Sequence, residues 1–445
     1  MRFLARGAFA PLPVLLFAAM PAFAQDAAPK VDAGDTAWML TSTALVLMMT
    51  VPGLALFYAG MVRKKNILAT MMQSVSIAAI ISIVWMVVGY SLAFGEGGAY
   101  VGDFSRLFLN GLAENWDKPF TLGTGDAAVA MTIPESVFLM FQMTFAIITP
   151  ALIAGAFADR MKFSALVVFT ILWSLVVYSP IAHWVWHPNG WIFALGALDF
   201  AGGTVVHINA GVAGLICALV LGKRVGLGAD NMSPYNLAFA VIGASLLWVG
   251  WFGFNAGSAL TAGGRAGMAM LVTQLAAAAA ALAWIFAEWI IKGKPSVLGA
   301  ISGVVAGLVA ITPASGFVLP IPAVIIGLVA GLAGFWGATA LKHMCGYDDS
   351  LDAFGVHGIC GIVGAILVGW FAYGPLSATT AAPDGIIGSM DQLIIQVQAS
   401  AAVFAYTAVA SYILLKIVDI LIGLRVTEEE EREGLDVSLH GERMG

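Results

Sequence analysis

Two histidines lie inside long apolar segments, where an imidazole is an uncommon side chain. His207 and His357 are each followed by glycines at the same spacing, so both segments read H-x3-G-x2-G, and an acidic residue, Asp199 or Asp352, precedes each. Ionisable side chains at membrane depth are costly and usually face a cavity or one another. A neutral imidazole donates from one ring nitrogen and accepts at the other. The pair could therefore hold a small polar solute in an apolar passage.

Each part of this pattern also has a simpler explanation. A lone histidine in a buried helix is often a hydrogen-bonded packing residue, and two glycine-rich helices can resemble each other by chance. Two histidines at matching places in two segments are harder to explain in this way, and they favour a pore.

Aromatic side chains gather near the predicted outer ends of several apolar segments. Phe141 and Phe145 are four residues apart, as are Phe254 and Ser258, so each pair shares a helix face. Three tryptophans follow the fourth segment: Trp184, Trp186 and Trp191. Membrane interfaces are rich in Trp and Tyr, which accounts for each group taken singly. Together, the rings and the hydroxyl predict a cation–π site that would attract a small cation without a carboxylate.

No motif in the chain favours an enzyme. The sequence has no HExxH motif, no acidic cluster at ligand spacing, no phosphate-binding G-x-x-x-x-G-K-[ST] loop and no G-x-S-x-G elbow. We therefore expect no catalytic residues, no metal and no cofactor.

The composition indicates that lipid surrounds most of the chain. Of its 445 residues 60% are hydrophobic and only 10% are charged, whereas a soluble domain has about 25% charged residues. No basic face suggests nucleic acid as a partner. Eleven apolar segments approach the ~20 residues that a membrane-spanning helix needs: 38–60, 68–94, 135–156, 164–184, 203–221, 237–257, 266–291, 296–313, 319–341, 355–373 and 392–422. The fold class is thus an all-α integral membrane protein.

Charges in the loops predict the orientation, because Lys and Arg accumulate on the cytoplasmic side. If the first span starts outside, ten Lys or Arg residues fall in inner loops, and Arg106, Lys118 and Arg265 alone fall in outer loops.

Residues 1–24 resemble a cleavable signal peptide with an A-x-A site at 22–24, although a short first helix is the alternative. We expect 25–37 to be periplasmic, 38–422 to span the inner membrane, and 423–445 to form a cytosolic tail. Its acidic composition favours a solvated helix end over a docking element.

The histidine motifs also predict how the spans are arranged. They fall in the fifth and tenth spans, so spans one to five and six to ten would be homologous halves. An odd number of spans places the halves in opposite orientations, and such inverted repeats put a substrate path at their interface. The expected architecture is two inverted five-helix repeats plus a final helix.

Five segments resemble the ammonium transporter (Amt/Mep/Rh) family. They read TVPGLALFYAG at 50–60, DFAGGTVVHINAGVAG at 199–214, WFGFNAGSA at 251–259, FGVHGICGIVG at 354–364 and GLRVTEEEEREGLDVSLHGE at 423–442. The resemblance covers the chain from about residue 38 onward. It implies a homotrimer with one conduction path in each eleven-helix subunit, and a trimeric PII-type signalling protein as a possible partner at the cytosolic face.

The resemblance also assigns roles to individual residues. An outer ammonium site would use Trp186, Phe141, Phe145 and Ser258, stacked gating rings would be Phe145 and Phe254, and the pore pair would be His207 and His357. Asp199 would be an acidic residue needed near the outer site, and its local interpretation is a helix N-cap. Asn255 and Thr312 are supporting positions. The run HWVWHPNGW at 183–191 departs from the family pattern, so Trp186 is the chosen cage ring and Trp184 the runner-up.

These features together predict transport of ammonium or ammonia. A channel for another small solute, such as urea or methylamine, is the first alternative, but the aromatic site favours a cation. An ammonium sensor or receptor is the second, and a membrane enzyme ranks last.

Overall fold

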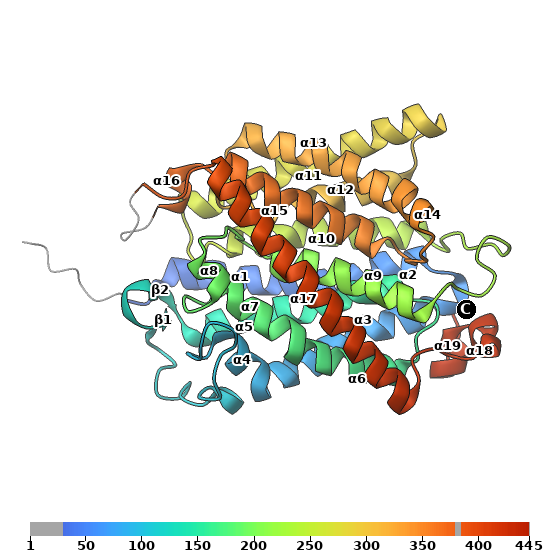
Figure 1. Ribbon diagram of the computed structural model, residues 1–445, viewed down its shortest axis with the longest axis horizontal. Coiled ribbons are helices and arrows are strands. Elements are labelled where there is room, and N and C mark those ends of the chain that lie inside the picture. The colour runs from blue at the N-terminus through green and yellow to red at the C-terminus, as the bar shows by residue number, and fades with distance from the viewer. Residues whose placement is uncertain (1–29, 379–383, 445) are drawn as a thin grey trace, which may run out of the picture.

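The computed structural model describes residues 30–378 and 384–444 as a bundle of long helices (Figure 1). The proposed signal peptide lies outside the described residues. Within them, ten helices are long and apolar enough to cross a membrane: Ala33–Met61, Lys64–Phe94, Glu135–Phe157, Phe163–Ala194, Gly203–Leu221, Leu237–Gly257, Gly264–Lys292, Pro320–Cys345, Phe354–Phe371 and Met390–Ile422. A shorter apolar helix, Val297–Ile311, occupies the place of the predicted eighth span. The membrane-helix fold class is therefore confirmed.

Several spans are assembled from consecutive helical pieces. In the first half these are α1 (Ala33–Met48), η1 (Met49–Leu54), α2 (Ala55–Met61), η2 (Lys64–Asn66), α3 (Ile67–Val84), η3 (Trp85–Gly89), α4 (Tyr90–Phe94), α5 (Glu135–Phe157), α6 (Phe163–Trp173), η6 (Ser174–Tyr178), α7 (Ser179–Trp186), α8 (Trp191–Ala194), η7 (Gly203–Ile208) and α9 (Asn209–Leu221). Short 3₁₀ turns η4 (Leu107–Leu109) and η5 (Gly125–Ala127) lie in the loop between α4 and α5.

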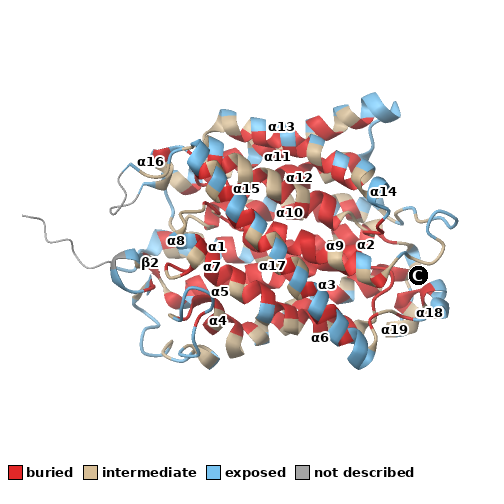
Figure 2. Ribbon diagram, in the orientation of Figure 1, coloured by how far each residue is buried: buried red, intermediate tan, exposed pale blue. Residues whose placement is uncertain are grey.

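The second half and the tail follow the same scheme. The elements are α10 (Leu237–Gly257), α11 (Gly264–Lys292), α12 (Val297–Ile311), α13 (Pro320–Trp336), η8 (Gly337–Leu341), α14 (Lys342–Cys345), η9 (Phe354–Ile359), α15 (Cys360–Phe371), α16 (Gly374–Ser377), α17 (Met390–Ile422), α18 (Glu428–Glu433) and α19 (Leu435–His440). Figure 1 shows α17 running obliquely across the other helices. Figure 2 shows that buried residues fill the middle of the bundle, whereas exposed residues gather at its two ends and alternate with buried ones on the outermost helices.

The two ends of the bundle carry different structures. At one end, which we call the hairpin end, β1 (Pro119–Leu122) pairs antiparallel with β2 (Val129–Pro134), with Thr121 opposite Ala130. At the other, the tail end, α18 and α19 lie near the C-terminus (Figure 1). The sequence did not predict the hairpin, because two short strands in a polar loop give little alternation of apolar and polar residues.

The tail packs against the bundle, contrary to the solvated helix end that its composition favoured. Glu431 is 1% exposed and accepts from the Arg425 guanidinium at 2.8 Å. Leu435 is also 1% exposed, and its N–H donates to the Asn66 side chain at 2.8 Å. The acidic run therefore contributes buried contacts as well as a solvated surface.

The two histidine-bearing helices cross where their motif glycines lie. A Cβ on Gly211 would stand 2.2 Å from the backbone nitrogen of Gly358, and one on Gly361 would stand 3.1 Å from the Cβ of His207. Small residues let helix backbones approach closely in lipid. The first glycine of each H-x3-G-x2-G motif therefore brings η7–α9 and η9–α15 together, and with them the two imidazoles.

Candidate functional site

A cavity of 170 Å³ opens at the hairpin end of the bundle. It is lined by Leu122 of β1, by Val129 and Met131 of β2, and by residues of four helices and the loops between them. All four side chains of the predicted recruitment site line it: Trp186, Phe141, Phe145 and Ser258. The Ser258 hydroxyl donates to the Phe254 carbonyl at 2.8 Å, which leaves its oxygen lone pairs free to accept.

The two candidate tryptophans have different surroundings. The Trp186 ring meets Phe145 edge-on, with centroids 5.7 Å apart, and its indole N–H donates to the Asp199 carbonyl at 3.0 Å. Trp184 instead packs against Tyr406, with centroids 4.7 Å apart, and donates to the Tyr100 carbonyl. Of the two, Trp186 is the ring that lines the cavity.

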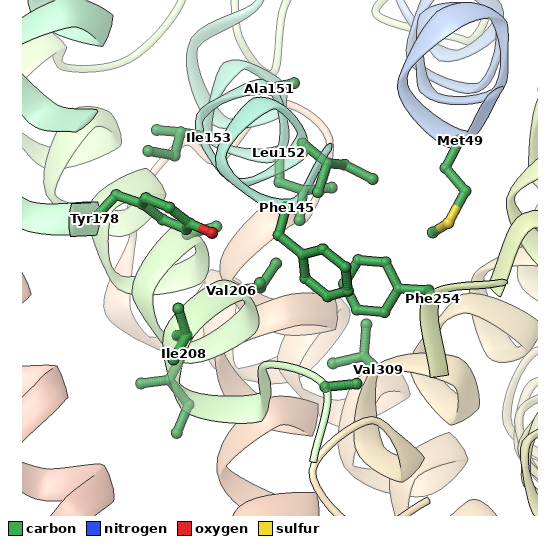
Figure 3. Close-up of a cluster of buried hydrophobic side chains, with 14 of the residues drawn as sticks. Met49, Phe145, Ala151, Leu152, Ile153, Tyr178, Val206, Ile208, Phe254 and Val309 are labelled. Carbon is green, nitrogen blue, oxygen red and sulfur yellow. The ribbon is translucent and has the colours of Figure 1, made fainter. Parts of the chain in front are cut away.

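Two phenyl rings close the inner side of the cavity. Phe145 and Phe254 are stacked with centroids 4.2 Å apart and planes inclined by 29°, and both are almost fully buried. Figure 3 shows the two rings overlapping between α5 and α10. Phe141 meets Phe145 edge-on at 4.9 Å, which holds the first ring from the cavity side.

The histidines lie directly beyond this ring pair. His207 is 6.0 Å from Phe254 and 5.5 Å from His357 between ring centroids, and the two imidazoles are inclined by only 21°. Their Nδ1 atoms are 3.4 Å apart. Both side chains are buried, at 1% and 3% exposure. The structure therefore brings together the two residues that the repeated motif singled out.

Thr312 determines which nitrogen of His207 carries the proton. Its hydroxyl donates to the Leu308 carbonyl at 2.8 Å and accepts from the Trp251 indole at 2.9 Å. The contact between Thr312 Oγ1 and His207 Nε2, at 3.3 Å, must then have Nε2–H as the donor, because the hydroxyl has one proton. Nδ1 of His207 is left to accept from Nδ1–H of His357. Nε2 of His357 is then the free acceptor.

A small apolar cavity adjoins the histidines. It measures about 10 Å³ and is lined by His207, His357, Trp251, Phe254 and eight aliphatic or aromatic residues. About 10–15 Å³ of such space is the minimum for one water molecule. The space therefore suits a solute of water or ammonia size, and its apolar walls disfavour an ion.

Asp199 holds the start of the helix that carries His207. Its carboxylate accepts from the backbone N–H groups of Gly202, Gly203 and Thr204 at 2.5–2.8 Å, and also from the Thr204 hydroxyl. These donors are the N–H groups that a helix start leaves without partners. Asp199 therefore links the Trp186 ring, which its carbonyl binds, to the position of His207.

The corresponding acid of the second half is Asp349 and not Asp352, which the sequence had paired with Asp199. Asp349 Oδ2 accepts from the Phe354 N–H at 2.7 Å, as Asp199 Oδ2 accepts from Thr204, in both cases across five residues. Burial raises the pKa of Asp349, although Lys342 partly opposes the shift. Asp352 forms an ion pair with Lys342 instead.

The two supporting positions have distinct surroundings. Thr312 contacts His207 directly, as described above. Asn255 donates to the Thr273 hydroxyl at 2.9 Å and thereby ties α10 to α11 beside Phe254.

Trp251 is a site residue that the sequence did not single out. Its ring stacks on His207 at 5.4 Å, and its indole fixes Thr312. Its spacing of three residues from Phe254 on a helix was the available signal.

A second histidine pair lies at the C-terminal end of α7 but offers no metal site. His183 and His187 stack with centroids 4.5 Å apart, at a spacing of four residues. Both ring nitrogens of His183 already contact backbone carbonyls, those of Ala93 and Gly98. Within residues 30–378 and 384–444, no group of three or more His, Cys, Asp or Glu side chains is placed to hold a metal ion.

Comparisons with known proteins agree with one another. The model of the Ammonium Transporter Family matches residues 37–444. An ammonium transporter of Bacillus subtilis is 50% identical over 92% of this chain and 98% of its own length, and one of Aquifex aeolicus is 47% identical over 96% and 97%.

Solved structures show the same fold. The crystal structure of Candida albicans Mep2 matches with a TM-score of 0.81 at 35% identity, over 90% of this chain and 88% of that one. A structure named Sensor Amt Protein matches with a TM-score of 0.82 at 29% identity, over 92% and 98%. The chain belongs to the Ammonium Transporter Family.

Proposed function

We propose that this protein transports ammonium across the inner membrane by conducting ammonia past His207 and His357. The observation that carries the proposal is an unbroken series of ring contacts from the hairpin-end cavity to the histidines. Trp186 meets Phe145, Phe145 stacks on Phe254, Phe254 lies beside His207, and His207 stacks on His357, with centroids 4.2–6.0 Å apart.

The first step is recruitment of ammonium in the cavity. The faces of Trp186, Phe141 and Phe145 attract a cation, and the Ser258 oxygen accepts one of its N–H groups. Each ring contributes about 0.5–2 kcal/mol. Removing the water from a small ion costs several kcal/mol, and these rings offset that cost only inside the cavity. The cavity can therefore concentrate ammonium but cannot draw the intact cation through the dry interior.

The second step is loss of a proton near the ring pair. The ammonia formed in this way can pass the stacked Phe145 and Phe254 rings and enter the small cavity beside the histidines. There His207 and His357 supply hydrogen-bonding groups, including the free Nε2 acceptor of His357. Potassium has no proton to lose, so the apolar passage excludes it. With the proton positions described above, His207 has no free acceptor nitrogen, so an inward relay of the released proton requires both rings to exchange tautomers. Transport with this relay is electrogenic.

The orientation and partners complete the proposal. The hairpin end faces the periplasm and the tail end faces the cytosol, in agreement with the distribution of Lys and Arg in the loops. Membership in the family supports a homotrimer and a PII-type signalling protein bound at the tail end. Apolar side chains exposed on the outer helices, such as Ile290, Ile321 and Ile420, suit contact with lipid or with another subunit.

Current measurements on a solid-supported membrane test the function. Purified protein in liposomes receives pulses of ammonium and, separately, of potassium. We expect the parent to give an ammonium current and no potassium current. The His207→Ala/His357→Ala variant should lose the ammonium current or become permeable to potassium. His343→Ala is the matched control, because His343 is exposed on α14 and lines neither cavity.

Two outcomes would contradict the proposal in different ways. An unchanged ammonium current in the double variant would remove the histidines from the pathway. A well-folded parent without any ammonium response would favour a sensor or a channel for another solute. Ammonium sensing is the second candidate, because the structure named Sensor Amt Protein shares this fold at a TM-score of 0.82.

A further inference from the structure

The hairpin-end cavity has two polar side chains among its lining residues, Ser258 and Gln142. The other lining side chains are apolar or aromatic, among them Phe138, Phe141, Phe145 and Trp186. The polar group of Trp186 is already engaged by the Asp199 carbonyl. An ion in this cavity therefore depends on Ser258 and Gln142 for hydrogen bonds to side chains.

The amide oxygen of Gln142 is buried without a partner. The residue is 8% exposed, and its Oε1 forms no hydrogen bond with any described residue. Buried side-chain polar atoms nearly always have a partner, so each exception requires an explanation. The terminal torsion of glutamine is broad and roughly two-fold. With no partner to fix it, the amide can turn either its oxygen or its nitrogen toward the cavity.

The helix places Gln142 in the middle of the aromatic wall. It follows Phe138 by four residues and precedes Phe145 by three on α5, so the three side chains share one face. All three line the cavity. The amide consequently lies among the rings that are proposed to attract the cation.

We propose that the Gln142 amide oxygen is a second hydrogen-bond acceptor for ammonium in this cavity. Ammonium has four N–H donors and no lone pair. Ser258 can accept one donor, since its own proton goes to the Phe254 carbonyl, and the rings accept others through their faces. Gln142 accepts a further one. This assignment rests on the proposed function and adds a specificity-determining residue to it.

The test measures the ammonium concentration for half-maximal current and the maximal current of reconstituted protein. Gln142→Leu should raise the half-maximal concentration about tenfold or more, since a hydrogen bond to a charged group is lost. The maximal current should change little, because the rings and histidines beyond the cavity are untouched. Gln142→Glu keeps an acceptor oxygen and should bind ammonium at least as tightly as the parent.

The chain offers a matched control. Gln73 on α3 is also buried, at 3% exposure, and its Oε1 also has no partner among the described residues, but it does not line the cavity. Gln73→Leu should leave both values unchanged. Removing an unpartnered amide does not destabilise a fold, so Gln142→Leu should unfold no earlier than the parent. If the Gln142→Leu variant does not fold, Gln142→Met, whose side chain is unbranched, is measured in its place.

The outcomes separate this assignment from the proposed function. A conducting parent whose Gln142→Leu and Gln142→Met variants keep its half-maximal concentration within twofold overturns the role of Gln142 alone. Loss of binding in Gln142→Glu as well shows that the amide donates, which also overturns it. A folded parent without ammonium current overturns the proposed function, and the assignment falls with it.

Discussion

Trp186 and Trp184 are two residues apart on α7, and yet their side chains have different neighbours. Two residues correspond to about 200° of helix rotation, so the side chains point to nearly opposite sides. Trp186 reaches the cavity and Phe145, whereas Trp184 packs on Tyr406. The residue spacing alone left both tryptophans open as the cage ring, because the choice depends on the surroundings of α7.

Substitution of each tryptophan by leucine should separate binding from packing. Trp186→Leu removes one ring face from the proposed ammonium site. We expect the half-maximal ammonium concentration to rise by about twofold to thirtyfold, which corresponds to one cation–π contact. Trp184→Leu should leave that concentration unchanged and lower the unfolding temperature, because a buried ring contact is lost. Currents and thermal unfolding of both variants check this, and equal effects on binding would contradict it.

The sequence identified the two histidines but not the positions of their protons. Matching motifs singled out His207 and His357, since the spacing to the glycines is a property of sequence. The proton positions depend on Thr312 and Trp251, which lie 105 and 44 positions from His207 in the chain. That arrangement follows from packing of three helices and had no signal in any one segment.

At the scale of elements, the spans were predictable because each must be apolar over its whole length. The fifth and sixth spans coincide with helices Gly203–Leu221 and Leu237–Gly257. The first and fourth helices are longer than expected, at Ala33–Met61 and Phe163–Ala194, because their ends continue into polar or aromatic residues. The β1–β2 hairpin was missed, since its strands have only four and six residues.

The crossing of the two histidine helices should be sensitive to a single methyl group. Gly211→Ala places a Cβ against the Gly358 backbone, with 2.2 Å between the atoms, so the helices must separate. We expect a lower unfolding temperature and loss of ammonium current, because His207 and His357 would move apart. The matched control is Gly267→Ala on α11, where a Cβ would meet nothing within 4 Å and alanine favours the helix by up to about 1 kcal/mol. A Gly211→Ala variant with parental current would refute this account of the motif.

At the scale of the whole molecule, the tail joins segments that are remote in sequence. Lys65 donates to the Glu431 carbonyl, and Arg425 donates to the carbonyls of Leu221 and Lys223. Composition predicted a solvated tail because it shows six charges in a row, 428–433, without showing their partners. The partners of the tail lie in three different loops, at Lys65, at 221–223 and at Met161, which forms an isolated β-bridge with Arg425, and they could be identified only from the fold.

The docked tail should respond to pH through Asp436. Burial raises the pKa of this carboxyl, although the Ala69 N–H that its Oδ1 accepts at 2.8 Å opposes the shift. A raised folded-state pKa means that docking is strongest in acid and weakens as pH rises through that pKa. Asp436→Asn keeps the oxygen and removes the charge, so it should slow hydrogen exchange in 425–440 at pH 7. Near pH 4 the variant and the parent should match.

Faster hydrogen exchange in the Asp436→Asn variant would contradict this prediction. If Asp436→Asn speeds exchange of the tail at pH 7, the carboxylate is stabilised by its neighbours and the sign is reversed. Asp391→Asn serves as the control, because Asp391 is exposed at the start of α17, at the hairpin end of the bundle.

The docked tail also has a consequence for the order in which the protein is made. Leu435 binds Asn66, and the two residues are 369 positions apart. The ribosome releases the tail only after every span has been synthesised, whereas earlier segments can begin to assemble during translation. The contacts of Leu435, Glu431 and Arg425 can therefore form only when the second, third and fifth spans have already presented their loops at the same side of the membrane. A chain with one of these spans inserted in the wrong direction would lack part of this surface, so we expect its tail to remain undocked.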